Sequence, residues 1–533
     1  MSSRSRKYLW LAWIGIPFII YLLHANFLKG WIVDDAGISF VYARSLASGY
    51  GLVSQPGVLP VEGYSNFLWV ALLTPFFAIH WFDPILTPKI ISAILVLATF
   101  LVLAKTFEQL SAHSWIASSV VLTFLAINTP FVVWTSSGLE NPLYCLELAF
   151  LLLLVCLAIT NPLFPRLNAL AIGLVFGLIA LTRPEGVLYF ALIPVVIILI
   201  LYKKKGVNWK ILANRALYVV LPAFLIFAGY LLFRRFYFGD FLPNTYYAKG
   251  GPTLAILKSI LLLSLDAYNR LAYLNTSFAN KYGELLFTIL MIAWLGLIIL
   301  RRIKREHLTL LAFYGVSIFA FLLLPNDWMK EFRFATPVVL FFYPVLYLAG
   351  ELWLKSINIH KFVRVGIACL AVLFFLVSSI HIFYQRTLSF ASSPTVPFSD
   401  VVRDLALPYN HAADKLGVQN GTLLIPDTGG TMYASNLRVY DLGGLCDKTI
   451  ARTMGRNQVA FYNYIFEDAK PTFIHTHYPW DLLANLDADP RFRSDYVTIR
   501  EALDPQANVF SGDYVRKDVL FGKENLLPTL FSP

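Results

Sequence analysis

Long apolar runs recur along this sequence and limit it to one kind of fold. From Tyr8 onward, segments of about 17 to 25 mostly apolar residues follow one another, which is the length that a helix needs to cross a bilayer core. Inside lipid every backbone N–H and C=O needs a partner within the structure, so such segments must be helical. The chain is 58% hydrophobic and only 14% charged, whereas soluble domains are about a quarter charged. We therefore predict a multi-pass, all-α membrane protein.

The basic residues indicate how these helices cross the membrane. The net charge is +11, but Lys and Arg gather at the ends of apolar runs. This arrangement argues against a nucleic-acid partner and follows the excess of positive charge in cytoplasmic loops. Arg4, Arg6 and Lys7 predict a cytoplasmic N-terminus, and the run from Tyr8 to Leu28 is long enough to be a retained helix rather than a cleaved signal peptide. Residues 31–65 then form the first outer loop.

Three later basic clusters also predict cytoplasmic loops. They are Lys203, Lys204, Lys205, Lys210 and Arg215; Arg301, Arg302, Lys304 and Arg305; and Lys355, Lys361 and Arg364. Six apolar runs lie between 66 and 203, yet an odd number of crossings is needed to bring the chain back to the cytoplasm. We expect 66–82 to be a re-entrant or surface helix, which leaves about eleven transmembrane helices. The stretch 252–274 is expected to be an amphipathic helix on the outer membrane surface.

The composition changes after about residue 385. Prolines and charges become frequent, and short β-branched patches that begin at Thr422 and Tyr496 alternate with glycine turns, as strands and loops do. We therefore predict a transmembrane domain over 1–385 and a soluble α/β domain over 386–533 on the outer face. The four cysteines are scattered and indicate neither a disulfide framework nor a zinc site.

Polar residues gather in the first outer loop. Asp34 and Asp35 directly follow the first predicted helix; desolvation raises the pKa of a carboxyl group and a second like charge raises it further, so such a pair suits general-base chemistry. Two solvated loop aspartates are the alternative. Arg44 lies on the helical stretch 36–48 and could clamp a phosphate or reach lipid headgroups. Side chains that could hydrogen-bond the hydroxyl groups of a sugar follow: Glu62, Tyr64, Ser65 and Asn66.

Several motifs occur in the order and spacing of one known family. They are Asp34-Asp35-Ala36, Tyr42-Ala43-Arg44, Gly49-Tyr50-Gly51-Leu52-Val53 and Val61-Glu62-Gly63-Tyr64-Ser65-Asn66-Phe67-Leu68-Trp69 in the first loop, then Ser137-Gly138-Leu139-Glu140, Leu181-Thr182-Arg183-Pro184-Glu185-Gly186, Pro243-Asn244-Thr245-Tyr246-Tyr247-Ala248-Lys249, and Asn326-Asp327-Trp328 with Arg333. In these motifs the chain resembles bacterial glycosyltransferases of the GT-C superfamily, in particular the terminal arabinofuranosyltransferase-like, family 39-like group. The resemblance covers about 31–337 and, more faintly, Asp427 to Arg452. Two positions depart from the pattern: Pro325-Asn326 precedes Asp-Trp where relatives have Gly-Gly, and Gly37 stands where a bulkier residue is usual.

The resemblance implies an enzyme that moves a sugar from a polyprenyl-phosphate donor to an extracytoplasmic acceptor, in the first place a cell-envelope glycan, by inverting displacement. It implies a first-loop aspartate as the catalytic base, Asp34 or Asp35, of which we favour Asp34. Cations must stabilise the leaving phosphate, and the candidates are Arg44, Arg183, Lys249 and Arg333. The residues expected to bind the sugar or the acceptor are Glu62, Tyr64, Asn66, Glu140, Glu185, Asn244, Tyr246, Asp327 and Trp328.

The motifs do not fix a cofactor. Some GT-C enzymes use a divalent ion such as Mg²⁺ or Mn²⁺ and others do not, and lone carboxylates at these spacings form no metal motif. His475 and His477, two residues apart in the tail, are a weak metal signal. The topology predicts a multi-pass protein of the cell (inner or plasma) membrane, with its N-terminus in the cytoplasm and its active site and C-terminal domain outside.

Other classes of protein stay open. A secondary transporter or lipid flippase would also have many helices and buried charges, although its charges would lie near the bilayer midplane rather than at one face. A scaffold for envelope assembly is also compatible with the pattern. The acceptor is equally open, because the same fold could act on a protein or on lipid A.

Overall fold

The computed structural model describes residues 3–161, 165–202, 209–250, 254–262, 264–279, 283–325, 327–504 and 509–531. Lys203, Lys204, Lys205 and Asn326, which the sequence analysis used, lie outside these ranges. The chain forms two compact units that alternate along the sequence. We call residues 1–30, 85–230 and 252–395 the helical unit, and residues 31–84, 231–251 and 396–533 the mixed unit.

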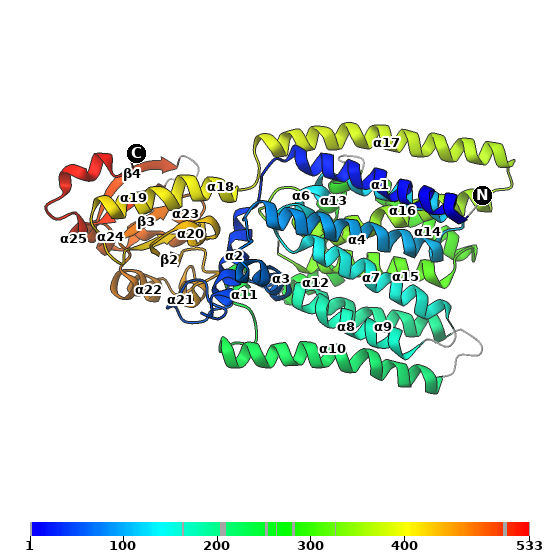
Figure 1. Ribbon diagram of the computed structural model, residues 1–533, viewed down its shortest axis with the longest axis horizontal. Helices are drawn as coiled ribbons and strands as arrows, with labels where there is room; N and C mark the ends of the chain where they lie inside the picture. The colour runs from blue at the N-terminus through cyan, green and yellow to red at the C-terminus, as the bar shows by residue number, and fades with distance from the viewer. Residues whose placement is uncertain are drawn as a thin grey trace. The chain divides into compact units, whose positions relative to one another are not determined.

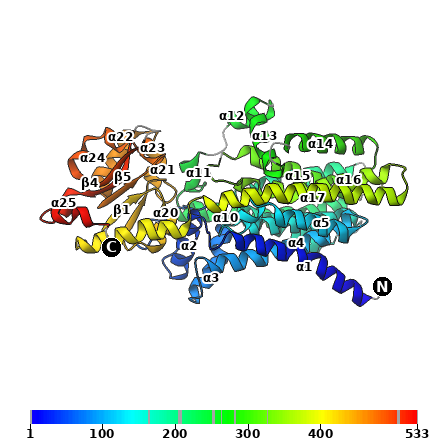
Figure 2. The ribbon, with the colours of Figure 1, turned by 90° about the horizontal axis from the view of Figure 1, so that it is seen from above.

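The helical unit consists of helices packed side by side (Figures 1 and 2). They are α1 (Ser3–Phe27), α4 (Leu86–Leu110), α5 (Ser114–Ile127), α6 (Thr129–Thr135), α7 (Asn141–Thr160), α8 (Arg166–Thr182), α9 (Gly186–Tyr202), α12 (Leu254–Leu261), α13 (Leu265–Ala279), α14 (Gly283–Ile299), α15 (Arg305–Leu323), α16 (Thr336–Ser356) and α17 (Lys361–Ser392), and α10 (Trp209–Tyr237) begins in this unit. Large side chains such as Phe100, Tyr144 and Phe341 fill the core. Helices that are apolar all round fit burial in protein and lipid.

Among the described residues, six helices are long and apolar enough to cross a membrane, or seven if α5 and α6, which are bent by 74° to each other, form one span. Four shorter apolar helices of the helical unit, Trp13–Phe27, Arg166–Thr182, Gly186–Ile200 and Leu285–Ile299, would bring the count to eleven, which stays a prediction. The run 66–82 contains only the 12-residue helix α3 (Phe67–Ala78). At about 1.5 Å per residue, α3 is shorter than the roughly 30 Å bilayer core. The stretch 252–274 was expected to be one amphipathic helix, but it holds two, α12 and α13.

The mixed unit contains a five-stranded sheet in the order β2-β1-β3-β5-β4 (Figure 1). The strands are β1 (Thr422–Ile425), β2 (Arg438–Asp441), β3 (Phe473–Thr476), β4 (Tyr496–Asp504) and β5 (Val509–Arg516). β1 pairs in parallel with β2 and β3, whereas β5 runs antiparallel to β3 and β4. The patches beginning at Thr422 and Tyr496 are thus strands, as the sequence predicts. Together with the helical unit, this sheet confirms a multi-pass helical membrane protein with a C-terminal α/β part.

The mixed unit also contains many short helices, several of which lie around the sheet (Figure 2). They are α2 (Asp34–Ala47), α3, α11 (Asn244–Lys249), α18 (Phe398–Val401), α19 (Leu407–Lys415), α20 (Thr428–Ala434), α21 (Lys448–Thr453), α22 (Gln458–Asn463), α23 (Trp480–Ala484), α24 (Pro490–Asp495) and α25 (Lys517–Leu520). Phe461, Ile465, Ile474 and Phe492 are part of the buried cluster beneath the sheet. The helix expected over 36–48 is α2.

Two glycines let the first loop and the C-terminal part touch backbone to backbone within the mixed unit. A Cβ on Gly37 of α2 would lie 2.5 Å from the carbonyl carbon of Gly429 in α20, and a Cβ on Gly429 would lie 1.8 Å from the carbonyl oxygen of Asp34. No side chain fits at such distances. The glycine at position 37, which departs from the family pattern, is therefore matched by a glycine on the helix that it contacts.

Candidate active site

Asp34 is buried at the start of α2 and binds the N-terminus of α20. Its two carboxylate oxygens accept hydrogen bonds from the backbone N–H groups of Gly430 at 2.7 Å and Gly429 at 3.0 Å, and the residue is only 6% exposed. Burial raises the pKa of Asp34 well above its usual range, the charges of Asp427 and Asp35 raise it further, and the two N–H groups act in the opposite direction. A carboxylate here satisfies the unpaired N–H groups of a helix end. Asp34 thus attaches the first loop to α20.

Asp35 has a different environment from its neighbour. Its side chain is 23% exposed, and a carboxylate oxygen lies 3.7 Å from Nζ of Lys249, whose side chain is 39% exposed. Lys249 ends α11, and the position of α11 is fixed by Asn244, whose amide donates hydrogen bonds to the carbonyl oxygens of Gly444 and Leu445 at 2.8 and 2.9 Å. The mixed unit therefore brings a carboxylate of the first loop and an ammonium group of the Pro243–Lys249 motif together at a partly accessible place.

Arg44 lies in the last turn of α2 and contacts the C-terminal end of α20. Its guanidinium donates hydrogen bonds to the carbonyl oxygens of Tyr433 at 2.8 Å and Met432 at 3.2 Å, and it lies 4.9 Å from the centre of the Tyr433 ring. These carbonyls belong to the last turn of α20, where the helix dipole favours a cation. Asp34 and Arg44 therefore complement opposite ends of α20. Arg44 therefore binds backbone carbonyl groups, whereas the sequence suggested that it could bind a phosphate.

Three residues at or next to the end of the first loop, which were expected to contact a sugar, have buried protein partners. Glu62 is buried and forms an ion pair with Arg234, 2.5 Å from its Nε. Tyr64 is buried with its ring edge against that of Tyr42, 4.8 Å between ring centres. Asn66 is buried and donates a hydrogen bond to Oγ of Ser39 at 3.1 Å. These contacts shape the loop.

A second group of the expected residues comes together in the helical unit. Arg183 pairs with Glu140 and Glu185, and Nε of Arg333 lies 3.0 Å from a carboxylate oxygen of Asp327. All five side chains are at most 10% exposed. Three separate motifs of the sequence thus form one buried cluster of charges, which the resemblance predicted only as separate positions.

One aromatic ring joins the two arginines of this cluster. The guanidinium of Arg183 lies 5.1 Å and that of Arg333 lies 4.6 Å from the centre of the Phe334 ring, distances at which cations are attracted by an aromatic face. Asn141 supports the cluster by donating hydrogen bonds to the carbonyl oxygen of Arg333 and to Thr336 at 3.2 and 3.0 Å. The sequence analysis missed Phe334 and Asn141, although each is adjacent to a motif residue that it named.

Trp328 and Tyr246 lie apart from these buried contacts. Trp328 is 64% exposed, although the residue before it, Asp327, is part of the arginine cluster. Tyr246 is half-buried beside Tyr247, 5.6 Å between ring centres, on the helix α11 that carries Lys249. Both aromatic side chains remain accessible enough to contact a substrate.

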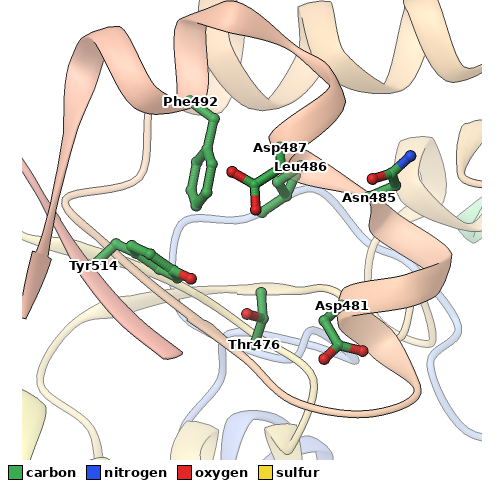
Figure 3. Close-up of a pocket in the computed structure, with 7 residues that line it drawn as sticks. All are labelled: Thr476, Asp481, Asn485, Leu486, Asp487, Phe492 and Tyr514. Carbon is green, nitrogen blue, oxygen red and sulfur yellow. The ribbon is translucent and has the colours of Figure 1, made fainter. Parts of the chain in front are cut away.

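The C-terminal part of the mixed unit has a small pocket of its own (Figure 3). It is lined by Thr476, Asp481, Asn485, Leu486, Asp487, Phe492 and Tyr514. Several of its polar groups already have protein partners: the Tyr514 hydroxyl donates to Glu501 at 2.7 Å, and Asp481 accepts from Ser511. We assign it no substrate. Nearby, ligand atoms of Asp427, His475 and His477 all lie within 4.8 Å of one another, a group able to hold a metal ion.

Comparison with solved structures places this architecture in a known class, the GT-C fold. An oligosaccharyltransferase, AglB from Archaeoglobus fulgidus, in complex with an inhibitory peptide and a dolichol-phosphate, is 11% identical, with a TM-score of 0.58 over 96% of this chain and 74% of that protein. ArnT from Cupriavidus metallidurans in the apo state is 12% identical, with a TM-score of 0.57 over 97% of this chain and 99% of that protein. ArnT from the same organism bound to undecaprenyl phosphate is 11% identical, with a TM-score of 0.52 over 96% and 98%.

Comparisons of the sequence alone assign no function. A family model described as a domain of unknown function (DUF8728) matches residues 411–518. No curated protein matches the sequence. At the identities of the solved structures the likeness establishes the fold alone, which is the GT-C type of architecture that the sequence predicts; the arabinofuranosyltransferase-like subgroup stays a prediction.

Proposed function

We propose that this protein is a membrane glycosyltransferase that transfers a sugar from a polyprenyl-phosphate donor to an acceptor outside the cytoplasm. The GT-C fold supports this proposal, as do two structures of similar fold, one in complex with a dolichol-phosphate and one bound to undecaprenyl phosphate. The single observation that carries it is the partly accessible pair of Asp35 and Lys249, which combines a candidate base with a cation for a phosphate.

Asp35, rather than Asp34, is the base in this proposal. Both carboxylate oxygens of Asp34 accept backbone N–H groups of α20, so a proton or a substrate would have to displace those bonds. The side chain of Asp35 is more exposed, at 23%, and Nζ of Lys249 lies 3.7 Å from one of its carboxylate oxygens. A general base must come within hydrogen-bond reach of the hydroxyl that it deprotonates. This replaces the preference for Asp34 that the sequence alone favours.

The proposed reaction is a single inverting displacement. The acceptor hydroxyl attacks the anomeric carbon, its proton passes to the Asp35 carboxylate, and the bond between the anomeric carbon and the phosphate oxygen breaks with its electron pair on the phosphate. Lys249 stabilises the charge that develops on the leaving phosphate. Arg183 and Arg333 belong to the helical unit, and their binding of a phosphate stays a separate prediction.

The carboxylates considered for Mg²⁺ or Mn²⁺ support no metal step in this proposal. Asp34 binds backbone N–H groups, Glu62 binds Arg234, and Glu140 and Asp327 bind arginines. The acceptor class, whether an envelope glycan, a protein or a lipid, is not restricted by these contacts. An inner or plasma membrane location with an outward-facing site is part of the proposal.

The test is sugar transfer by the purified protein in nanodiscs, with a panel of radiolabelled polyprenyl-phosphate sugars and envelope acceptors. Transfer from one of these donors, with inverted anomeric configuration in the product, is the expected result. A protein that binds donor without cleaving it, and that moves the intact lipid across liposome membranes, would be a flippase, and the proposal would be wrong.

A further inference from the structure

Two adjacent parallel strands of the mixed unit bring three potential metal ligands to one edge of the sheet. β1 and β3 pair with Leu424 opposite Ile474, so the chain positions that follow place Asp427 near His477. His475 and His477 are two residues apart, and side chains two apart on an extended chain point to the same side. The carboxylate of Asp427 and ring nitrogens of both histidines lie within 4.8 Å of one another.

His475 is held as metal-binding histidines usually are. Its Nδ1 donates to a carboxylate oxygen of Asp513 at 2.7 Å, which leaves Nε2 as the nitrogen available to a metal. Asp513 is itself buried and receives hydrogen bonds from Tyr409 and Arg500. A carboxylate that accepts from the second ring nitrogen fixes the tautomer and orientation of a metal ligand. This network orients His475 although it is not part of the charge clusters described above.

His477 is oriented by backbone. Its Nδ1 lies 2.8 Å from the carbonyl oxygen of Tyr478, to which it can only donate, and its Nε2 lies 2.7 Å from a carboxylate oxygen of Asp427. Nε2 of His477 therefore faces the carboxylate of Asp427, which is the third residue of the group.

We propose that Asp427, His475 and His477 bind a divalent transition-metal ion, with Zn²⁺ the best match. Two imidazole nitrogens and one carboxylate are a ligand set of zinc sites that leave a fourth position for water or a substrate oxygen. Ligand atoms around tetrahedral zinc are roughly 3.3 Å apart, so the most distant pair must approach by up to about 1.5 Å, and Nε2 of His477 must move about 0.6 Å away from the Asp427 carboxylate. His477 has room to adjust because it follows the end of β3 and its side chain is 37% exposed.

A bound metal would stabilise the position of α20, the helix that Asp34 of the first loop binds. Asp427 immediately precedes α20, whose first N–H groups are bound by Asp34. An ion that fixes Asp427 therefore also fixes the N-terminus of α20 against α2. The proposal does not depend on the glycosyltransferase function, since it concerns only binding and stability.

The test is metal binding by the full-length protein, stripped with a chelator and titrated with Co²⁺ and then Zn²⁺. We expect one Co²⁺ per chain with the visible absorption of a tetrahedral site, displacement by Zn²⁺, and a loss of affinity of at least about 10-fold in Asp427→Asn and in His477→Gln. Removing the supporting carboxylate in Asp513→Asn should weaken binding by about 10- to 100-fold. The matched control is His411→Gln, because His411 is an exposed histidine of the same unit, on α19.

Unchanged affinity in both Asp427→Asn and His477→Gln, or no metal bound by the wild type at micromolar Co²⁺ or Zn²⁺, would overturn the proposal. X-ray absorption of the wild-type zinc form is a second measurement that needs no variant. Scattering from two imidazole rings at about 2.0 Å is expected, whereas a shell of oxygen or sulfur atoms without imidazole would contradict the assignment.

Discussion

The contact between Gly37 and Gly429 gives the sharpest prediction about stability. In Gly37→Ala the new methyl group would lie 2.5 Å from the carbonyl carbon of Gly429, so α2 and α20 must separate by about 1 Å to reach ordinary contact. Overpacking of this kind costs about 1–3 kcal/mol. The movement also weakens the two bonds from Asp34 to α20, worth about 1.5–3 kcal/mol each when fully lost. Alanine is about 1 kcal/mol more favourable than glycine inside a helix. We therefore expect the free energy of unfolding to fall by about 3 kcal/mol in total.

The unfolding of the mixed unit can be followed through the exposure of one buried cysteine. Cys446 is buried in the mixed unit, whereas Cys145, Cys156 and Cys369 belong to the helical unit. Replacing those three leaves Cys446 as the reporter in thermal unfolding followed with a thiol-reactive dye, and about 3 kcal/mol corresponds to a midpoint lower by roughly 6 to 12 °C.

The control for this prediction is Gly350→Ala in the helix α16, where the added Cβ meets no atom within 4 Å. It should leave the Cys446 midpoint unchanged. A Gly37→Ala protein that unfolds at the wild-type temperature would refute the close approach of α2 and α20.

Three further predictions concern the same unit. Glu62→Gln should destabilise it by about 3–5 kcal/mol, because Arg234 would lose its buried partner, and the double variant with Arg234→Met should recover much of that loss when both are measured by pulse proteolysis. Arg44→Ala should cost about 1–3 kcal/mol and should raise amide hydrogen exchange in the last turn of α20, with unchanged exchange arguing against the carbonyl contacts. Burial raises the pKa of Asp441 from 3.8 to about 7, so the folded state binds a proton that the unfolded state has lost, and stability should fall by about 3 kcal/mol from pH 5 to pH 8. Asp441→Asn should flatten that dependence, and a wild-type profile that rises over this range would contradict it.

The sequence predicts those parts of the fold that depend on the length of apolar runs and on β-branched patches. Apolar length alone predicts the spanning helices, because lipid permits no other backbone arrangement. The patches at Thr422 and Tyr496 are strands, as their β-branched residues indicate. The break between α12 and α13 was missed because the apolar pattern continues through it. The exact number of spans depends on helices too short to decide by length.

The site was harder to predict because its geometry depends on contacts between distant segments. Nothing in the adjacent pair Asp34-Asp35 indicates that one carboxylate binds α20 and the other lies beside Lys249. That difference arises only when residues 231–251 and 396–533 pack onto the first loop within the mixed unit. For the same reason Arg44 was considered for a phosphate, since the carbonyl groups that it binds are almost four hundred residues away in sequence. The cluster around Arg183 was also predicted only as separate positions, because its three motifs are far apart in the sequence.

The most direct test of the account compares sugar transfer by the wild type, Asp35→Asn and Asp34→Asn, each measured on folded protein with donor binding determined in parallel. Loss of a positioned general base reduces transfer by about 10²- to 10⁴-fold. We predict that loss for Asp35→Asn with donor binding retained, whereas Asp34→Asn unfolds more easily but transfers at a rate within about 10-fold of wild type while folded. Normal transfer by Asp35→Asn, together with loss of transfer in stable Asp34→Asn protein, would contradict the assignment of Asp35 as the base.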